Sequence, residues 1–430
     1  MRPAIHNFTD LRLTCPTPVQ LPNGMPMWVI GNGEDEVCRL TLIVGGGAMH
    51  ESKSMLAYIT AANVLQGNRL QSPAEVAEAL DYHGAWKASQ AHDFCSILSI
   101  SSLNEHLEKM AELFMNCVSQ PSLPVDELGV TKQRLASNCA TSRQQVKTLA
   151  SDAMRQLYYG PRHPLGRITT PEGIMSITPQ EVEQFHTQHY NSSNCRVIVS
   201  GKVTDRELAI VERTVGAWEC PGPVDDEVEP PIEPQDKMLE IVDKPKAVQS
   251  ALCITLRAVP RRHPDYNRLR VLIMALGGYF GSRLNLNIRE QKGYTYGIHA
   301  FLAGRKADAY IGINTECATQ YTWPIIDEVK REMLRLHNEL IPEVELNIVK
   351  QHIMSDLAKT IDTPFTMAEY VNSTLLFGTY PEYFNDQVAT LEQVTSQELR
   401  ELARRYLLPE RLRTVIAGDA QALNSKAVEQ

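Results

Sequence analysis

Two histidines one helical turn apart are the first residues in this sequence whose types and spacing could do chemistry. His186 and His189 lie in a segment predicted to be helical, where residues three apart are neighbours on the helix surface. A zinc ion needs at least three protein ligands, and the sequence indicates no third ligand for this pair. We therefore interpret both as surface histidines and predict no metal site here.

The other reactive side chains are isolated. His50-Glu51 and His92-Asp93 are adjacent pairs whose members point in different directions on a helix or strand, and we interpret them as structural or solvated groups. The nine cysteines include no C-x-x-C pair, which a zinc ribbon or a dithiol redox site would require. The sequence thus contains no local signature of a metal site or a nucleophilic cysteine.

Composition and charge narrow the classes of function. Lys and Arg total 42 and Asp and Glu total 51, for a formal net charge of −9, which argues against a general nucleic-acid binder because such a protein needs a basic face. Residues 1–19 lack the apolar core of a signal peptide, and no run of about 18 apolar residues could span a membrane. Scattered single cysteines suit a reducing compartment. We expect a cytoplasmic protein that contacts neither nucleic acid nor membrane.

One segment divides the chain into two halves of similar size. Residues 220–234 read C-P-G-P-V-D-D-E-V-E-P-P-I-E-P. So many prolines cannot sustain a helix or a central strand, and they make a linker semi-rigid. The segment therefore predicts an N-terminal domain at 1–219, a linker at 220–234 and a C-terminal domain at 235–430.

The two halves repeat the same order of elements. Thr178 with Glu181 and Thr395 with Glu398 form capping boxes, and each box is followed by a helix, a turn and a short apolar strand ending in glycine. Earlier in each half, strand-like runs at 37–45 and 250–256 and alternating segments at 93–101 and 307–315 are each followed by a helix. Residues 125–156, almost free of glycine and proline, form a long helical stretch. The pattern predicts an α+β fold of two homologous domains, each a mostly antiparallel sheet packed with helices.

A set of short segments in a fixed order resembles the pitrilysin family of zinc peptidases, which includes mitochondrial processing peptidase and insulin-degrading enzyme. The resemblance covers about residues 18–419, and the segments that carry it are Leu21-Pro22-Asn23-Gly24, Gly45-Gly46-Gly47 before Glu51, Leu80 to Ala85, Gln120-Pro121, His163-Pro164-Leu165-Gly166-Arg167, Thr178 to Gly201, Ser282-Arg283-Leu284 and Ile288 to Tyr296. It implies a chain that forms half of a clamshell, because a full chamber in this family needs four such domains.

Active members of the family carry an H-x-x-E-H motif in the first helix, where both histidines bind zinc and the glutamate activates water. At the corresponding positions this sequence has Tyr58 for the first histidine, Ala61 for the glutamate and Ala62 for the second histidine. The resemblance places the third zinc ligand within residues 128–151, where no carboxylate occurs. It therefore implies an inactive homologue with no catalytic residue, no metal and no cofactor of its own.

The resemblance also implies a substrate-binding element, in which Arg289 and Tyr296 contact a peptide. A guanidinium offers several fixed donors to carbonyl or carboxylate oxygens, and a phenol can donate to a developing oxyanion. Gly293 would permit a turn between the two residues. The alternative is that Arg289 pairs with a local carboxylate and Tyr296 packs, and Tyr294 is a second candidate for the phenol.

Two functions follow as hypotheses from this resemblance. In the first, the chain is the non-catalytic, substrate-binding subunit of a heterodimeric zinc peptidase, and the zinc belongs to a homologous partner subunit. The bound molecule would be an extended peptide, added to an edge strand inside the chamber. In the second, the chain forms a catalytically dead homodimer that binds peptides or acts as a scaffold. Peptide hydrolysis by the isolated chain is not expected in either case.

Overall fold

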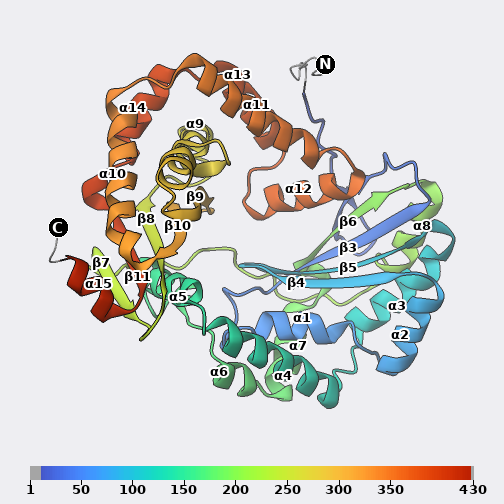
Figure 1. The fold of residues 1–430 in the computed structure, drawn as a ribbon. Coiled ribbons are helices and arrows are strands. Elements are labelled where there is room, and N and C mark those ends of the chain that lie inside the picture. The colour runs from blue at the N-terminus through green and yellow to red at the C-terminus, as the bar shows by residue number, and fades with distance from the viewer. Residues whose placement is uncertain (1–10, 428–430) are drawn as a thin grey trace.

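The computed structural model describes residues 11–427, with side chains described to residue 424, and contains two mixed sheets covered by helices (Figure 1). The first sheet has the order β1-β2-β6-β3-β5-β4, with β1 (Val19–Gln20), β2 (Pro26–Ile30), β3 (Val37–Gly45), β4 (Trp86–Ala91), β5 (Cys95–Leu103) and β6 (Cys195–Gly201). The second has the order β7-β11-β8-β10-β9, with β7 (Leu239–Asp243), β8 (Gln249–Arg257), β9 (Thr295–Gly304), β10 (Ala309–Ala318) and β11 (Arg413–Gly418). One pair in each sheet is parallel and the others are antiparallel. The predicted α+β fold with two mostly antiparallel sheets is confirmed.

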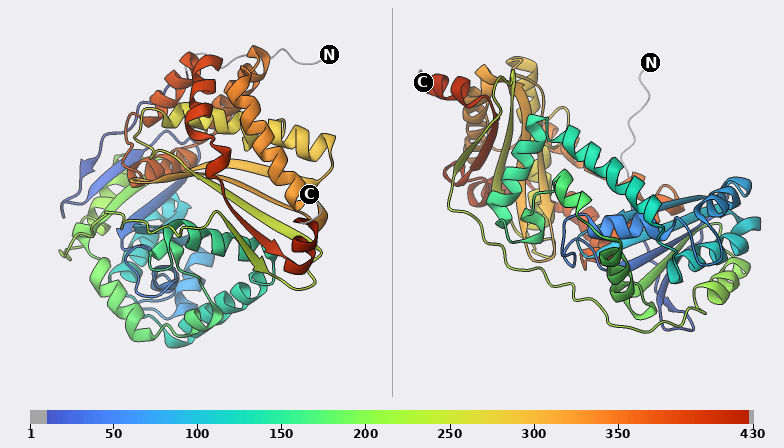
Figure 2. Two further views of the ribbon diagram at one scale, coloured as in Figure 1. Left: turned by 90° about the vertical axis from the view of Figure 1, so that its left-hand side faces the viewer. Right: turned by 90° about the horizontal axis from the view of Figure 1, so that it is seen from below.

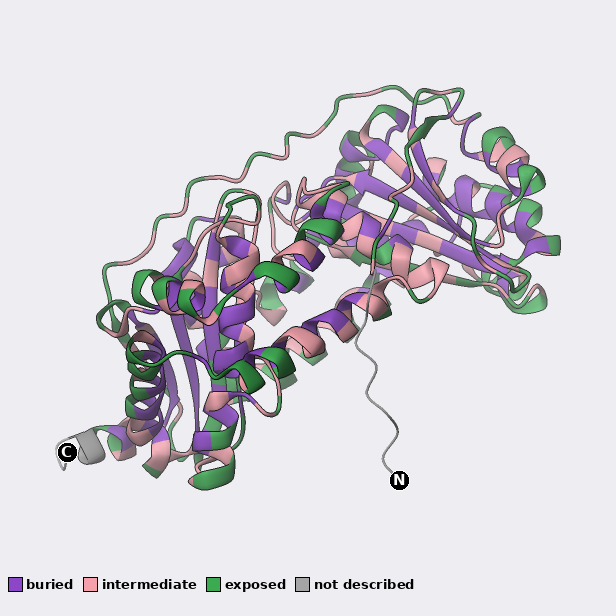
Figure 3. Cartoon of the chain, turned by 90° about the horizontal axis from the view of Figure 1, so that it is seen from above, coloured by how far each residue is buried: buried purple, intermediate pink, exposed green. Residues whose placement is uncertain are grey.

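The helices follow the order expected from the repeat. In the first half they are α1 (Leu56–Val64), α2 (Pro73–Tyr82), α3 (Leu107–Ser119), α4 (Val125–Ser142), α5 (Val146–Tyr159), α6 (Pro171–Met175), α7 (Pro179–His189) and α8 (Asp205–Thr214). In the second half they are α9 (Tyr266–Ile273), α10 (Thr322–Asn338), α11 (Glu343–Thr360), α12 (Pro364–Leu376), α13 (Tyr383–Gln393), α14 (Ser396–Tyr406) and α15 (Ala420–Ala427). Two π-helical segments, η4 (Met274–Gly278) and η5 (Asn285–Gln291), lie between α9 and β9. Buried residues lie along the strands and on the helix faces turned toward them (Figure 3).

Both predicted capping boxes are present. The Thr178 hydroxyl accepts a hydrogen bond from the Glu181 amide ahead of α7, and Thr395 does the same for Glu398 ahead of α14. Each glutamate reaches back to the amide of its threonine. These bonds satisfy amides at the start of the helix that have no partner within it.

Loss of the α14 cap has a predictable cost. We expect Thr395→Ala to lower the free energy of unfolding by about 1 kcal/mol, because two side-chain hydrogen bonds at the first turn are lost. Urea unfolding followed by circular dichroism measures this change. Thr395→Ser keeps the hydroxyl and is the matched control. Equal stability of the alanine and serine variants would contradict the prediction.

The long helical stretch predicted at 125–156 is two helices rather than one. α4 ends at Ser142 and α5 begins at Val146, and Arg143 between them donates to the Asp152 carboxylate at 2.8 Å. The break is set by tertiary packing, because α4 packs against α1 and α6 whereas α5 packs against strands of the second sheet. The local sequence contains no glycine or proline that would mark this position.

Each half of the chain supplies one helix to the sheet of the other half. α5 lies against β8 and β11 of the second sheet, and α12 lies against β6 and β2 of the first (Figure 1). Leu157 of α5 and Val371 of α12 are both fully buried in these contacts. The division at 1–219 and 235–430 therefore stays a prediction about order along the chain, since apolar packing joins the two parts.

The predicted linker contains no helix or strand and runs as an extended segment along the outside of the molecule (Figure 2). Its carboxylates pair with both halves. Asp225 accepts a hydrogen bond from buried His189 at 2.7 Å. Glu227 pairs both with Arg196 of β6 and with Lys306, which follows β9. Ion pairs therefore hold the linker against both halves of the chain, in addition to the stiffness that its prolines give it.

Candidate functional site

Helix α1 carries Tyr58, Ala61 and Ala62, the positions that the resemblance assigns to the zinc motif. Ala61 is fully buried in the first core, and Tyr58 and Ala62 are half-buried. The helix packs against α4, α7 and β4, so its inner face is filled by apolar contacts. Alanine has no atom that can bind a metal or accept a proton, and its high helix propensity suits this position.

The start of α1 is held by a buried carboxylate. Glu51 is 9% exposed and accepts hydrogen bonds from the amides of Met55 at 3.0 Å and Ala57 at 3.1 Å. Arg167 donates to the Glu51 backbone carbonyl at 2.7 Å. Burial raises the pKa of Glu51 to about 7, against the lowering effect of the amide hydrogen bonds and of Arg167. Glu51 thus orders the N-terminus of α1.

The histidine pair on α7 is not the surface pair that the sequence suggests. His189 is only 2% exposed, and its Nδ1 lies 2.7 Å from the Asp225 carboxylate. His186 donates from Nε2 to the Val118 carbonyl at 2.9 Å, and burial lowers the pKa of its imidazole. Burial alone would raise the pKa of the Asp225 carboxyl. Hydrogen bonds from His189 and Asn194 instead hold this pKa below its ordinary value. The spacing of the pair did not reveal this role, because the partner is in the linker.

Over residues 11–427 no group of three or more His, Cys, Asp or Glu side chains is arranged to hold a metal ion. The absence of metal and cofactor from this chain stays a prediction from the missing ligands on α1.

The Arg–Tyr element lies at the free edge of the second sheet. Tyr296 is on the edge strand β9 and is 95% exposed. Arg289 is in η5, where its guanidinium lies 4.1 Å from the centre of the Phe280 ring and 3.2 Å from the Glu290 carboxylate. Gly293, with a φ of +66°, makes the turn that joins η5 to β9.

The alternative to substrate contact, a local ion pair for Arg289 and packing for Tyr296, is found for one of the two residues. The local ion pair expected for Arg289 is present, whereas Tyr296 does not pack. Tyr294 instead stacks on Tyr321, with ring centres 4.6 Å apart and nearly parallel planes. Tyr296 is therefore the phenol available to a ligand, and no described contact joins it to Arg289.

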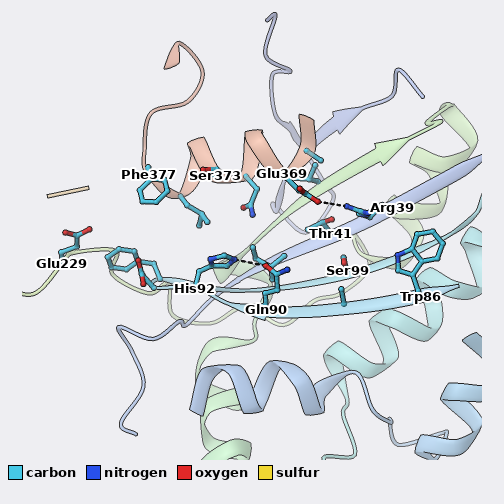
Figure 4. A pocket seen from close by; sticks show the side chains of 18 residues that line it. Arg39, Thr41, Trp86, Gln90, His92, Ser99, Glu229, Glu369, Ser373 and Phe377 are labelled. Atoms are coloured by element: carbon cyan, nitrogen blue, oxygen red, sulfur yellow. Dashed lines mark hydrogen bonds and ion pairs between the residues drawn. The ribbon is translucent and has the colours of Figure 1, made fainter. Parts of the chain in front are cut away.

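A cavity of about 470 Å³ lies between the first sheet and α12 (Figure 4). Its floor is formed by side chains of β3, β5 and β6, and one side is formed by β4. Its lining residues include Thr41, Trp86, Ala88, Gln90, Ile97, Ser99, Ile198, Ala368, Asn372 and Leu376. At one end Arg39 pairs with Glu369 at 3.4 Å. The cavity exists because α12 crosses from the second half of the chain to cover this face.

Strand β4 borders this cavity and is an edge strand of the first sheet. The amide of His92 donates to the Cys95 carbonyl at 2.7 Å, which closes the β4–β5 hairpin. Backbone groups alternate in direction along an antiparallel strand, so the amides and carbonyls of Lys87, Ser89 and Ala91 point away from β5. An extended segment could pair with them by strand addition, with its side chains beside Trp86 and Gln90.

The cavity residues were not singled out from the sequence. Trp86, Ala88 and Gln90 alternate with residues that face the helices, which is a weak strand signal on its own. Helix α12 reaches this face only through long-range packing, so local patterns could not place it there.

The comparisons with known proteins agree with this architecture. Residues 176–353 match the family model described as "Peptidase M16 inactive domain". Through these residues the chain is similar to the pitrilysin, or M16, peptidase family. The match spans the linker, so it includes parts of both halves of the chain.

Two relatives in Bacillus subtilis illustrate the range of names in the family. The uncharacterized zinc protease YmxG is 20% identical, over 89% of this chain and 93% of YmxG. The probable inactive metalloprotease YmfF is 22% identical, over 68% of this chain and 70% of YmfF. Together with the missing zinc ligands, these matches are consistent with a non-catalytic, peptidase-like protein.

Solved structures share the fold. A peptidase M16 inactive domain from Pseudomonas fluorescens superimposes with a TM-score of 0.85 at 21% identity, over 94% of this chain and 98% of that one. A chain of complex III2 from Candida albicans superimposes with a TM-score of 0.74 at 15% identity, over 96% and 99%.

The periplasmic protease PqqL from Escherichia coli is longer. It gives a TM-score of 0.79 at 17% identity, over 96% of this chain but only 46% of PqqL. This chain thus spans about half the length of PqqL. Among the described helices, none has the length and apolar character needed to cross a membrane.

Proposed function

We propose that this chain is the non-catalytic, substrate-binding subunit of a heterodimeric zinc peptidase. It would form half of a clamshell, and a homologous partner would supply the zinc and the general base. The proposal rests chiefly on one observation. Tyr296 is 95% exposed on the edge strand β9, in a chain whose α1 has Tyr58, Ala61 and Ala62 where the resemblance expects zinc ligands and a general base.

A partner chain is supported by the length comparison. PqqL contains about twice this length in one chain, which fits a chamber built from two halves. The complex III2 chain, of this length, is part of a multi-subunit assembly. By analogy, the present chain would meet its partner as a second polypeptide.

Peptide binding is supported by two of the edge strands. β4 and β9 each lie at the end of a sheet, and an extended peptide can add to such an edge through main-chain hydrogen bonds. At β9 the Arg289 guanidinium could donate to a peptide carbonyl and the Tyr296 phenol to an oxyanion. We also predict a cytoplasmic location and no contact with nucleic acid or membrane.

The test is reconstitution with a similar-sized family member that has an intact H-x-x-E-H motif. We expect peptide cleavage only when both chains are mixed. Arg289→Ala or Tyr296→Phe should lower kcat/KM about tenfold, because each removes one hydrogen bond in which either the donor or the acceptor is charged. Tyr294→Phe is the matched control, since it removes a phenol hydroxyl from a ring that stacks on Tyr321.

Three results would contradict parts of the proposed function. Full activity of both variants in the mixture would remove the substrate role of the Arg–Tyr element. Cleavage by the zinc-bearing chain alone, unchanged on mixing, would remove the subunit role. A stable homodimer that binds peptides but activates no partner would favour the scaffold function.

A further inference from the structure

A second cavity, of about 400 Å³, lies on the other side of α12 and plays no part in the function proposed above. It is enclosed by α9, η4, β9, α11, α12 and α13. Much of its lining is apolar, with contributions from Ile273, Met274, Ala300, Phe301, Leu302 and Leu357. The polar side chains of the lining include Arg261, Arg270, His299, Tyr370, Tyr383 and Gln387.

Neither arginine of this cavity is neutralised by a carboxylate among the described side chains. Arg261 lies over the Phe377 ring at 3.8 Å and near the Tyr383 ring at 5.4 Å, and its Nε is buried without a hydrogen-bond partner. Arg270 donates only to the neutral amide oxygen of Gln387. Ring faces and an amide orient a guanidinium, but they leave its net charge uncompensated.

The one carboxylate in the lining is already engaged. Asp356 pairs with Lys359 at 3.0 Å and lies 3.6 Å from His352, both on α11. The local charge of the cavity is therefore positive. Partly buried cations without a counter-ion are costly, and a bound anion relieves this cost.

Gln387 links Arg270 to the two tyrosines of the cavity. Gln387 accepts from Arg270 and donates to the Tyr370 hydroxyl at 2.8 Å and to the Tyr383 carbonyl at 3.2 Å. Burial raises the pKa of Tyr383 to about 12, so its phenol stays protonated and can donate at neutral pH. The cavity thus presents guanidinium and phenol donors at fixed positions against an apolar wall.

From this arrangement we infer a binding site for a carboxylate attached to an apolar body. The guanidinium groups of Arg261 and Arg270 hold the carboxylate, and the apolar wall takes the rest of the molecule. A free organic acid and the C-terminal carboxylate of a peptide share this chemistry. The site does not depend on a zinc-bearing partner, so it can be tested on the isolated chain.

The experiment measures binding of phenylacetate and phenylacetamide to the full chain by isothermal titration calorimetry. We expect the acid to bind at least tenfold more tightly than the neutral amide, because only the acid pairs with the guanidinium groups. Arg261→Gln and Arg270→Gln should each weaken binding of the acid by about tenfold or more. Arg268→Gln, on α9 but outside the cavity, is the matched control.

A second measurement covers the case in which a variant does not fold. Phenylglyoxal modifies accessible arginines, and mass spectrometry of the wild-type chain locates the modified residues. Phenylacetate should protect Arg261 and Arg270 but not Arg268, and phenylacetamide should protect none. Equal binding of acid and amide, no binding of either, or unchanged affinity in folded arginine variants would overturn the inference.

Two peptides distinguish the sources of the carboxylate. One ends in phenylalanine with a free carboxylate, and the other is the same peptide with an amidated end. Competition of only the free-acid peptide with phenylacetate would assign the site to peptide C-termini. Competition by neither, with phenylacetate still bound, would assign it to free organic acids.

Discussion

Leu157→Ala is expected to lower the free energy of unfolding by about 3 kcal/mol, because it removes a large side chain from a fully packed contact. Leu157 is 0% exposed on α5, where it packs with Ala251 and Val415 of the second sheet. The cavity left behind lies between two parts of the chain that are far apart in sequence. Neither part can fill it without moving α5 as a whole.

The same substitution also tests cooperativity. Because α5 covers the second sheet and α12 covers the first, loss of one contact should destabilise both halves together. Trp28 reports on the first sheet and Trp323 on the second half. We expect fluorescence of single-tryptophan variants and circular dichroism to show coincident urea transitions.

Two variants serve as comparisons for Leu157→Ala. Val371→Ala, in the reciprocal contact of α12, should also be destabilising but by less, because fewer methyl groups are removed. Leu334→Ala, at a 46% exposed position of α10, should change stability by no more than about 0.5 kcal/mol. Two separate urea transitions in the wild-type chain would contradict the idea that the packing of α5 and α12 on each other's sheets makes the two halves unfold together.

Glu51→Gln is expected to change how stability depends on pH. The pKa of Glu51 is about 7 in the folded chain and near 4.5 when unfolded. Between pH 4.5 and pH 7, Glu51 is therefore mostly protonated in the folded state and mostly ionised in the unfolded state. The stabilising effect of protonation is fully present below pH 4.5 and is lost as the pH rises through 7. Wild-type stability therefore falls in this window, and glutamine does not titrate.

The expected size follows from about 1.4 kcal/mol for each pKa unit. Between pH 5 and pH 8 the wild-type chain should lose roughly 2–3 kcal/mol relative to Glu51→Gln. Urea unfolding at a series of pH values measures this difference. Glu75→Gln is the control: hydrogen bonds from Ser72 lower the pKa of Glu75, so it is ionised in both states across this window. Parallel pH profiles of wild type and Glu51→Gln would contradict the prediction.

Much of the fold could be predicted because its signals are local. The capping boxes at Thr178 and Thr395 and the strand at 37–45 depend on neighbouring residues, and they are found where the sequence places them. The sequence also predicts the absence of zinc ligands, since Tyr58, Ala61 and Ala62 stand at the positions that the resemblance assigns to the zinc motif. Gly293 marked a turn because few other residues adopt its backbone conformation.

The rest depends on contacts between distant segments. The sequence alone determined two repeated α+β halves, a proline-rich connection and a first helix without metal ligands. Only the tertiary structure decided that α5 and α12 each pack on the sheet of the other half of the chain. It also decided that His189 is buried against Asp225, and that Arg261 and Arg270 line one cavity. The physical reason is that capping and strand signals act over a few residues, whereas these arrangements are selected by apolar burial and charge pairing across the whole chain.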